Sequence, residues 1–121
     1  MNVSKRVDLT YLLNLTENNT SQLIECVNLF IECTSKEIEQ MKKCCEDKNY
    51  KNVQASAHKL RSSIGAILSL EYRIALELIE DYSSSEKNFS LLLRLIKEFQ
   101  NEALLAFQEL EVAKDKLNTI K

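Results

Sequence analysis

Apolar residues recur along most of the chain at alternating steps of three and four, which is the spacing of one face of an α-helix. This pattern predicts five or six helices joined by short turns, with no linker between them. Their apolar stripes cover residues 9–15, 23–45, 50–67, 68–82 and 92–120. Asp8 is the expected cap of the first helix, and Asn18–Ser21 offers the cap of the second. The turns are expected at residues 47–49 and 83–85.

The last two stripes carry further expectations. The fourth helix is expected to bury Leu68, Tyr72, Ala75, Ile79 and Tyr82. The last helix keeps heptad spacing at Leu92, Ile96, Phe99, Ala103, Ala106, Leu110, Ala113, Leu117 and Ile120. Its alanines allow close approach of a neighbouring helix, and its end beyond about Leu110 is expected to project from the bundle.

Composition supports the same fold class. The chain has 121 residues, 45% of them hydrophobic, with one glycine and no proline. Hairpin signals are therefore missing, and the length suits one domain with a real core. Short turns between long helices favour antiparallel neighbours. We predict an all-α domain over residues 1–121, an up-down-up-down four-helix bundle with a short additional N-terminal helix.

Charge and hydropathy exclude two classes of partner. A formal net charge of −2 argues against a nucleic-acid-binding protein, which needs a strongly basic surface. No apolar run approaches the roughly 20 residues of a membrane span, and no charged and then apolar leader opens the chain. We therefore expect a stand-alone cytoplasmic protein that contacts neither nucleic acid nor membrane.

The four cysteines do not have the spacing of a zinc site, and one histidine cannot complete a Cys/His cluster. We therefore expect no metal. Cys26 and Cys33 lie beside or within an apolar helical face, where a thiol behaves as a small hydrophobe. The adjacent pair Cys44 and Cys45 is a weaker candidate for a redox role, which no other feature supports.

The only histidine, His58, is the main candidate for chemistry. The third helix buries Val53, Ala57, Leu60, Ile64 and Ile67, and at about 100° per residue His58 points away from that stripe. Its own face is polar and basic and carries small residues. An imidazole in such a place can meet a partner from outside. Leu12, Ile24 and Ile31 remain outside the core stripes and are candidates for an apolar docking surface.

Taken together, four features resemble the histidine-containing phosphotransfer (HPt) domain of bacterial multistep phosphorelays. They are Val7-Asp8-Leu9, Phe30 in the long second helix, Asp47 before the third, and Ala57-His58-Lys59-Leu60-Arg61-Ser62-Ser63. The resemblance extends over essentially the whole chain. It implies a phosphoryl carrier that takes a phosphoryl group from a receiver-domain phosphoaspartate and passes it to another receiver, without an ATP site of its own.

Residue by residue, the resemblance places the phosphoryl group on His58. The family usually has lysine three residues later and a small residue, commonly glycine, at the fourth; Arg61 and Ser62 stand there. With Lys59, they are the candidates for phosphate contacts, because phosphoryl transfer needs neutralisation of spreading charge. Glu80 falls where the family often orients the imidazole through its other ring nitrogen, and Gln54 is a second candidate.

The resemblance also implies the partners. They are response-regulator receiver domains and a hybrid sensor histidine kinase. No cofactor is expected on this chain, because the Mg²⁺ ion would be held by the partner receiver domain. We expect a phosphocarrier rather than an enzyme, and a monomer rather than a dimer.

Two alternatives come from other classes of protein. One is a helical interaction or dimerisation bundle without phosphotransfer, using the alanine-bearing last helix as its surface. The other is a histidine-kinase phosphoacceptor domain, since residues 58–62 faintly echo its H-E-L-R-T-P box. In this chain, Lys59 stands in place of the acidic residue of that box, which serves as a base, and Ser63 stands in place of its proline. A chain with one glycine also cannot form a glycine-rich nucleotide lid.

Overall fold

The computed structural model describes residues 6–85 and 89–120 of the chain. Within them, the helices are α1 (Thr10–Leu15), α2 (Thr20–Glu46), α3 (Tyr50–Ile64), α4 (Leu70–Ser85) and α5 (Phe89–Ile120). The only pairing of β type in these residues is an isolated antiparallel bridge between Val7 and Leu68. The predicted all-α bundle with a short N-terminal helix is confirmed.

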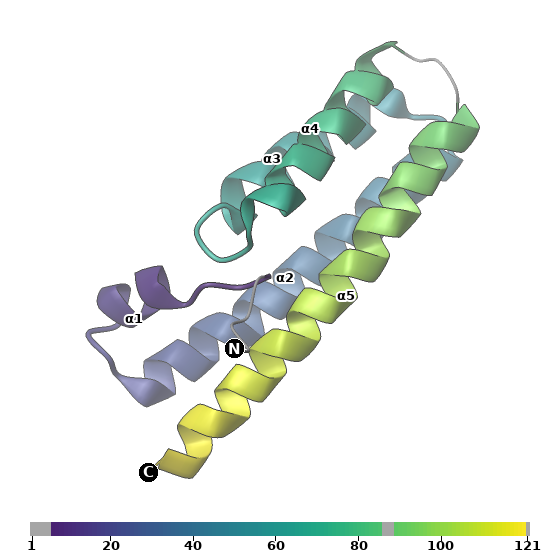
Figure 1. Cartoon of the computed structure of the whole chain (residues 1–121). Coiled ribbons are helices and arrows are strands. Elements are labelled where there is room, and N and C mark those ends of the chain that lie inside the picture. Colours follow the sequence, from purple (N-terminus) through teal and green to yellow (C-terminus); the bar gives the residue numbers. More distant parts are fainter. Residues whose placement is uncertain (1–5, 86–88, 121) are drawn as a thin grey trace.

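The four long helices pack in a closed ring. Each of α2, α3 and α4 contacts the next helix in the chain, and α5 returns to contact α2. Figure 1 shows α2 and α5 side by side along the whole molecule, with α3 and α4 against one half of that pair and α1 beside the other half. The described helices therefore form an up-down-up-down bundle.

Side-chain caps explain where α2 and α3 begin. Asn19 accepts a hydrogen bond from Gln22 N at 3.1 Å, and Asn49 accepts one from Asn52 N at 3.3 Å. The start of α1 differs from the prediction: Leu9 stands at the cap position without a side-chain cap hydrogen bond. Asp8, the expected cap, lies one residue earlier and accepts a hydrogen bond from Thr10 N at 2.9 Å. Hydrogen bonds from the Thr10 hydroxyl and N–H lower the pKa of Asp8. Ionised Asp8 therefore stabilises the folded state at neutral pH, and this stabilisation is lost as acid protonates the carboxylate.

Two other predicted boundaries were wrong. Helix α3 ends at Ile64 rather than Ile67, because the next segment bonds to the N-terminal strand-like residues: Asp8 N donates to Ile67 O at 2.7 Å. Helix α4 continues through residues 83–85 instead of ending before them. Serine hydroxyls can bond backbone carbonyls within a helix, and Ser83 Oγ donates to Glu80 O at 2.9 Å.

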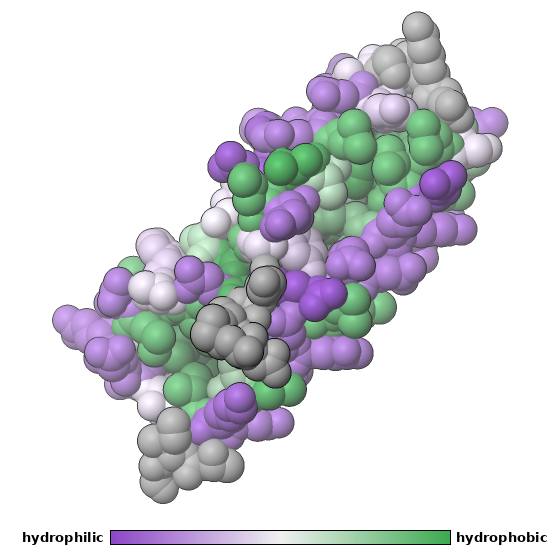
Figure 2. All heavy atoms as spheres, viewed as in Figure 1, coloured by the Kyte–Doolittle hydropathy of each residue, from purple (hydrophilic) through white to green (hydrophobic). Residues whose placement is uncertain are grey.

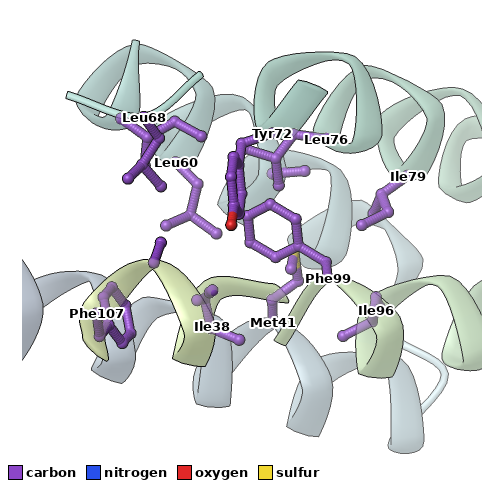
Figure 3. Packing of buried hydrophobic residues seen from close by; sticks show 14 of the residues in the cluster. Ile38, Met41, Leu60, Leu68, Tyr72, Leu76, Ile79, Ile96, Phe99 and Phe107 are labelled. Carbon is purple, nitrogen blue, oxygen red and sulfur yellow. The ribbon is translucent and has the colours of Figure 1, made fainter. Parts of the chain in front are cut away.

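The core is continuous from α2 to α5. The Tyr72 ring meets the Phe99 ring edge to face at 6.0 Å, and the Tyr72 hydroxyl donates to Glu102 O at 2.8 Å. Figure 3 shows apolar side chains from both sides of the bundle converging, among them Ile38, Met41, Leu60, Leu76, Ile79, Ile96 and Phe99.

The apolar face of α4 differs from the predicted stripe. Leu76 is fully buried, whereas Ala75 and Tyr82 are only half-buried. Ser83 is buried in place of Tyr82. Leu68, Tyr72 and Ile79 are buried as predicted. The two stripes therefore differ by a rotation of less than half a residue, and both have helical spacing, so periodicity alone could not choose between them. The positions of α3 and α5 decide which face of α4 lies inside.

The end of α5 does not project from the bundle over the residues whose side chains are described. Leu117 packs against the core, and Lys114 Nζ donates to Asn28 Oδ1 of α2 at 2.8 Å. Ala103 and Ala106 are fully buried within the bundle. The small side chains of this face are therefore already used inside the molecule.

Replacing Leu76 by alanine should lower the free energy of unfolding by about 2–5 kcal/mol, because it removes a fully buried side chain and leaves a cavity. Urea denaturation would measure the change. Leu104→Ala is the matched control, since Leu104 is about half exposed and should cost less than about 1 kcal/mol. Equal losses for the two variants would contradict the observed core.

The cysteines are all free thiols, but their surroundings differ. Cys44 and Cys45 are buried and Cys26 is partly buried. Burial raises the pKa of Cys45, with a smaller contribution from the Glu46 charge, so this thiol forms a reactive thiolate less readily. Cys33 is exposed, so of the two places expected for it, beside or within an apolar face, it lies beside the face.

The described residues contain neither a membrane-spanning helix nor a metal-binding cluster. Within residues 6–85 and 89–120, no helix has both the length and the apolar character needed to cross a membrane. The same part of the chain contains no group of three or more His, Cys, Asp or Glu side chains placed to hold a metal ion.

Candidate functional site

His58 lies near the middle of α3, on the face turned away from the core. Its neighbour Ala57 and the following Leu60 are buried, whereas the His58 side chain is 65% exposed. The helix thus anchors the backbone of His58 firmly through its buried face while leaving the imidazole open to solvent. This placement agrees with the angular position expected from the apolar stripe.

Glu80 reaches the imidazole from the neighbouring helix. Because α3 and α4 pack against each other, Glu80 Oε1 comes within 3.4 Å of His58 Nδ1. The Glu80 side chain is only 14% exposed, in contrast to the histidine that it faces. A carboxylate in this position can accept a hydrogen bond from a protonated Nδ1. The ring is then held with the lone pair of Nε2 unprotonated. The residue predicted to orient the imidazole therefore lies beside it.

Arg61 lies one turn after His58 and contacts three groups at once. Its Nη2 is 3.1 Å from His58 Nδ1, its Nε is 2.9 Å from Glu80 Oε2, and its Nη1 is 3.2 Å from Glu77 Oε2. The buried Glu80 Oε2 has no well-aligned hydrogen bond, so its contact with Arg61 is an ion pair. We call His58, Arg61, Glu77 and Glu80 the His58 network.

Glu77 is the member of this network that sequence reasoning missed. It precedes Glu80 by three residues, so the two carboxylates lie on the same face of α4. Glu77 Oε2 also lies 3.9 Å from Arg73 Nε, one turn earlier on the helix. The spacing of Glu77 and Glu80 was visible in the sequence, but no local signal pairs that face with Arg61.

The other predicted site residues lie around His58 without touching it. Lys59 turns toward α2, where its Nζ is 3.2 Å from Glu37 Oε1. Ser62 is exposed, and Gln54 is half-buried. Within the described residues, no hydrogen bond joins either of them to the imidazole. The structure thus brings together His58, Arg61 and Glu80, and it leaves Lys59, Ser62 and Gln54 at its edge.

The surface around His58 is less basic than the helix alone indicates. Arg61 is paired with Glu77 and Glu80, and Lys59 is paired with Glu37. These carboxylates come from α2 and α4, so the third helix considered by itself could not reveal them. The Arg61–Glu77 and Lys59–Glu37 pairs are partly exposed, and ion pairs of this kind are worth roughly 0–1 kcal/mol each. An arriving phosphoryl group can therefore compete for these cations.

The expected apolar docking residues are not the exposed ones. Leu12 is buried in the core, and Ile24 and Ile31 are half-buried. Large exposed apolar side chains instead include Leu70, Ile74 and Leu78 of α4. Figure 2 shows apolar atoms gathered along the seam between α4 and α5. A groove of about 220 Å³ lies in this seam, lined mainly by Tyr72, Ala75, Leu78, Leu95 and Phe99 with glutamates at its rim.

Comparison with protein-family models, curated proteins and solved structures found no match to this chain.

Proposed function

We propose that this chain is a phosphorelay carrier that accepts a phosphoryl group on His58 from the phosphoaspartate of one receiver domain and passes it to another. The observation that supports this most strongly is the difference in surroundings between the two ring nitrogens of His58. One ring nitrogen, Nδ1, faces the nearly buried carboxylate of Glu80. The other, Nε2, has no hydrogen bond or ion pair to any described residue, and the side chain is largely exposed.

The chemistry follows from that contrast. When Nδ1 carries the proton, the lone pair of Nε2 is available to attack phosphorus. A P–N bond forms while the P–O bond to the donor aspartate breaks, and the donor leaves as a carboxylate. The proton stays on Nδ1, where Glu80 balances the positive charge of the phosphorylated ring. Attack by the aspartate of a second receiver reverses these steps.

Charge stabilisation would come from both proteins. Arg61 lies beside the ring and can turn a donor nitrogen toward the phosphoryl oxygens. Lys59 and Ser62 lie on the same helix, one and four residues after His58, and would contribute once a partner has docked. A receiver domain would supply the Mg²⁺ ion, as the HPt resemblance implies. The proposed partners are accordingly response-regulator receivers and a hybrid sensor histidine kinase, and the proposed location is the cytoplasm.

The alternatives have less support. An interaction bundle would use the alanine face of α5, yet Ala103 and Ala106 are fully buried within this bundle. A histidine-kinase phosphoacceptor domain needs an acidic residue directly after its histidine, where this chain has Lys59. Neither alternative gives a role to the carboxylate that meets His58 Nδ1.

The direct test is incubation with a receiver domain phosphorylated by a small-molecule phosphodonor such as acetyl phosphate. We expect label to move to this chain, to be labile in acid and stable in base, and to map to the peptide that contains His58. A receiver carrying an alanine in place of its phosphorylated aspartate is the control. Label on any other residue, or no transfer from a panel of phosphorylated receivers, would overturn the proposal.

A further inference from the structure

The Nδ1 atom of His58 has two neighbours that demand opposite protonation states. Arg61 can only donate a hydrogen bond, so its Nη2 contact at 3.1 Å requires an unprotonated Nδ1. The Glu80 carboxylate accepts, so its contact at 3.4 Å requires Nδ1 to carry the proton. A neutral imidazole has one proton and cannot satisfy both.

The two arrangements differ in reactivity. If Nδ1 accepts a hydrogen bond from Arg61, the proton of the neutral ring lies on Nε2, and this exposed nitrogen has no lone pair for attack. If Nδ1 donates a hydrogen bond to Glu80, the lone pair of Nε2 is available. The position of the Arg61 guanidinium therefore determines which nitrogen of the neutral ring is nucleophilic.

Glu77 is the group that favours one of these positions. It holds Arg61 Nη1 at 3.2 Å, while Glu80 holds Nε on another edge of the guanidinium. With both anchors in place, Nη2 is directed at Nδ1. Without Glu77, the guanidinium has one carboxylate anchor and can leave Nδ1 for part of the time. Glu77 itself does not touch His58 in any contact among the described residues.

We propose that Glu77 is a positioning residue that holds Arg61 against His58 Nδ1 and thereby keeps the resting imidazole in its Nε2-protonated form. An arriving phosphoryl group would draw Arg61 away. Nε2 would then release its proton to water, Nδ1 would take one up from water, and the new Nδ1–H would donate a hydrogen bond to Glu80. The kinetic part of this inference rests on the proposed function, whereas the protonation of the ring does not. The role of Glu77 in ring protonation and the proposed phosphotransfer function can therefore be refuted separately.

The single histidine makes the test direct, because ¹⁵N NMR of the free protein shows only one pair of ring nitrogens. At a pH where imidazole is neutral, the nitrogen shifts report the ratio of the two tautomers. Glu77→Ala should move this ratio about threefold toward the Nδ1-protonated form, as expected from loss of one half-exposed ion pair. Arg61→Ala should move it in the same direction.

The matched control is Glu98→Ala. Glu98 is a helical glutamate that, like Glu77, is about half exposed, and it pairs with Arg94 at 3.2 Å on α5. This variant should leave the ring signals unchanged. If Glu77→Ala does not fold, Glu77→Gln keeps the side-chain shape and should give a smaller shift of the same sign. An unchanged ratio in the folded Glu77 variant, or a shift toward the Nε2-protonated form, would overturn the inference.

Transfer kinetics separate positioning from charge loss. Glu77→Ala should accept a phosphoryl group from a phosphorylated receiver about threefold faster, because it frees both Arg61 and the lone pair of Nε2. Arg61→Ala should instead be slower despite the same shift in tautomer. Slower transfer by Glu77→Ala would contradict the kinetic part. If the ring responds as expected but no variant accepts label, then the proposed function is wrong and the positioning role of Glu77 stands.

Discussion

His58→Gln is expected to abolish phosphoryl acceptance while leaving the fold intact. Glutamine keeps a polar side chain that can still accept a hydrogen bond from Arg61, but its amide nitrogen is not a nucleophile. The side chain of His58 is 65% exposed and away from the core, so the free energy of unfolding should change by no more than about 0.5 kcal/mol. Label transfer and urea denaturation measure the two effects on the same sample.

A matched control for this variant is Gln54→Ala, one turn earlier on the same helix and without a hydrogen bond to the imidazole in the described residues. It should keep most of the transfer activity. Undiminished labelling of His58→Gln would show that the phosphoryl group goes elsewhere. Unfolding of the variant would show instead that His58 has a structural role.

Arg61→Ala is expected to slow phosphoryl acceptance about a hundredfold, equivalent to about 2.7 kcal/mol of transition-state stabilisation. The reason is that Arg61 is a cation held beside the imidazole, with its Nη2 at 3.1 Å from His58 Nδ1. Single-turnover transfer from a phosphorylated receiver would measure the rate. Arg61→Lys keeps the charge without the planar fork and should recover only part of the loss.

The structure adds a stability effect to this prediction. Arg61 is the ion-pair partner of the nearly buried Glu80, so its removal leaves a carboxylate without compensation. We expect Arg61→Ala to lower the free energy of unfolding by about 1–3 kcal/mol. Arg73→Ala is the control for loss of a surface arginine, because Arg73 is about half exposed and its Nε lies 3.9 Å from Glu77 Oε2. Transfer by Arg61→Ala at the parent rate would assign the phosphate contact to Lys59 or to the partner.

Local sequence was enough to predict the elements and the exposure of the main residue. The helices follow from short-range spacing of apolar residues, and their starts follow from Asn19 and Asn49, whose side chains cap the residues that come after them. The exposure of His58 follows from its angle to the buried stripe of its own helix. None of these features depends on how distant segments are placed.

The boundaries and registers that were mispredicted depend on distant partners. Helix α3 ends at Ile64 because residues near the N-terminus bond to the segment that follows it. Leu76 is buried because α4 is rotated by its packing against α3 and α5, and the sequence of α4 fits two rotations nearly equally well. The spacing of apolar residues predicts the direction of a helix's buried face only to within a fraction of a turn.

The same division applies to the candidate site. The sequence by itself determined that His58 is exposed and that Arg61 shares its side of the helix. Only the tertiary structure decided that Glu77 and Glu80 meet that arginine, and that Glu37 neutralises Lys59. Contacts within a helix recur at fixed spacings, whereas contacts between helices depend on their relative shift and rotation. That shift and rotation are set by the packing of the whole core.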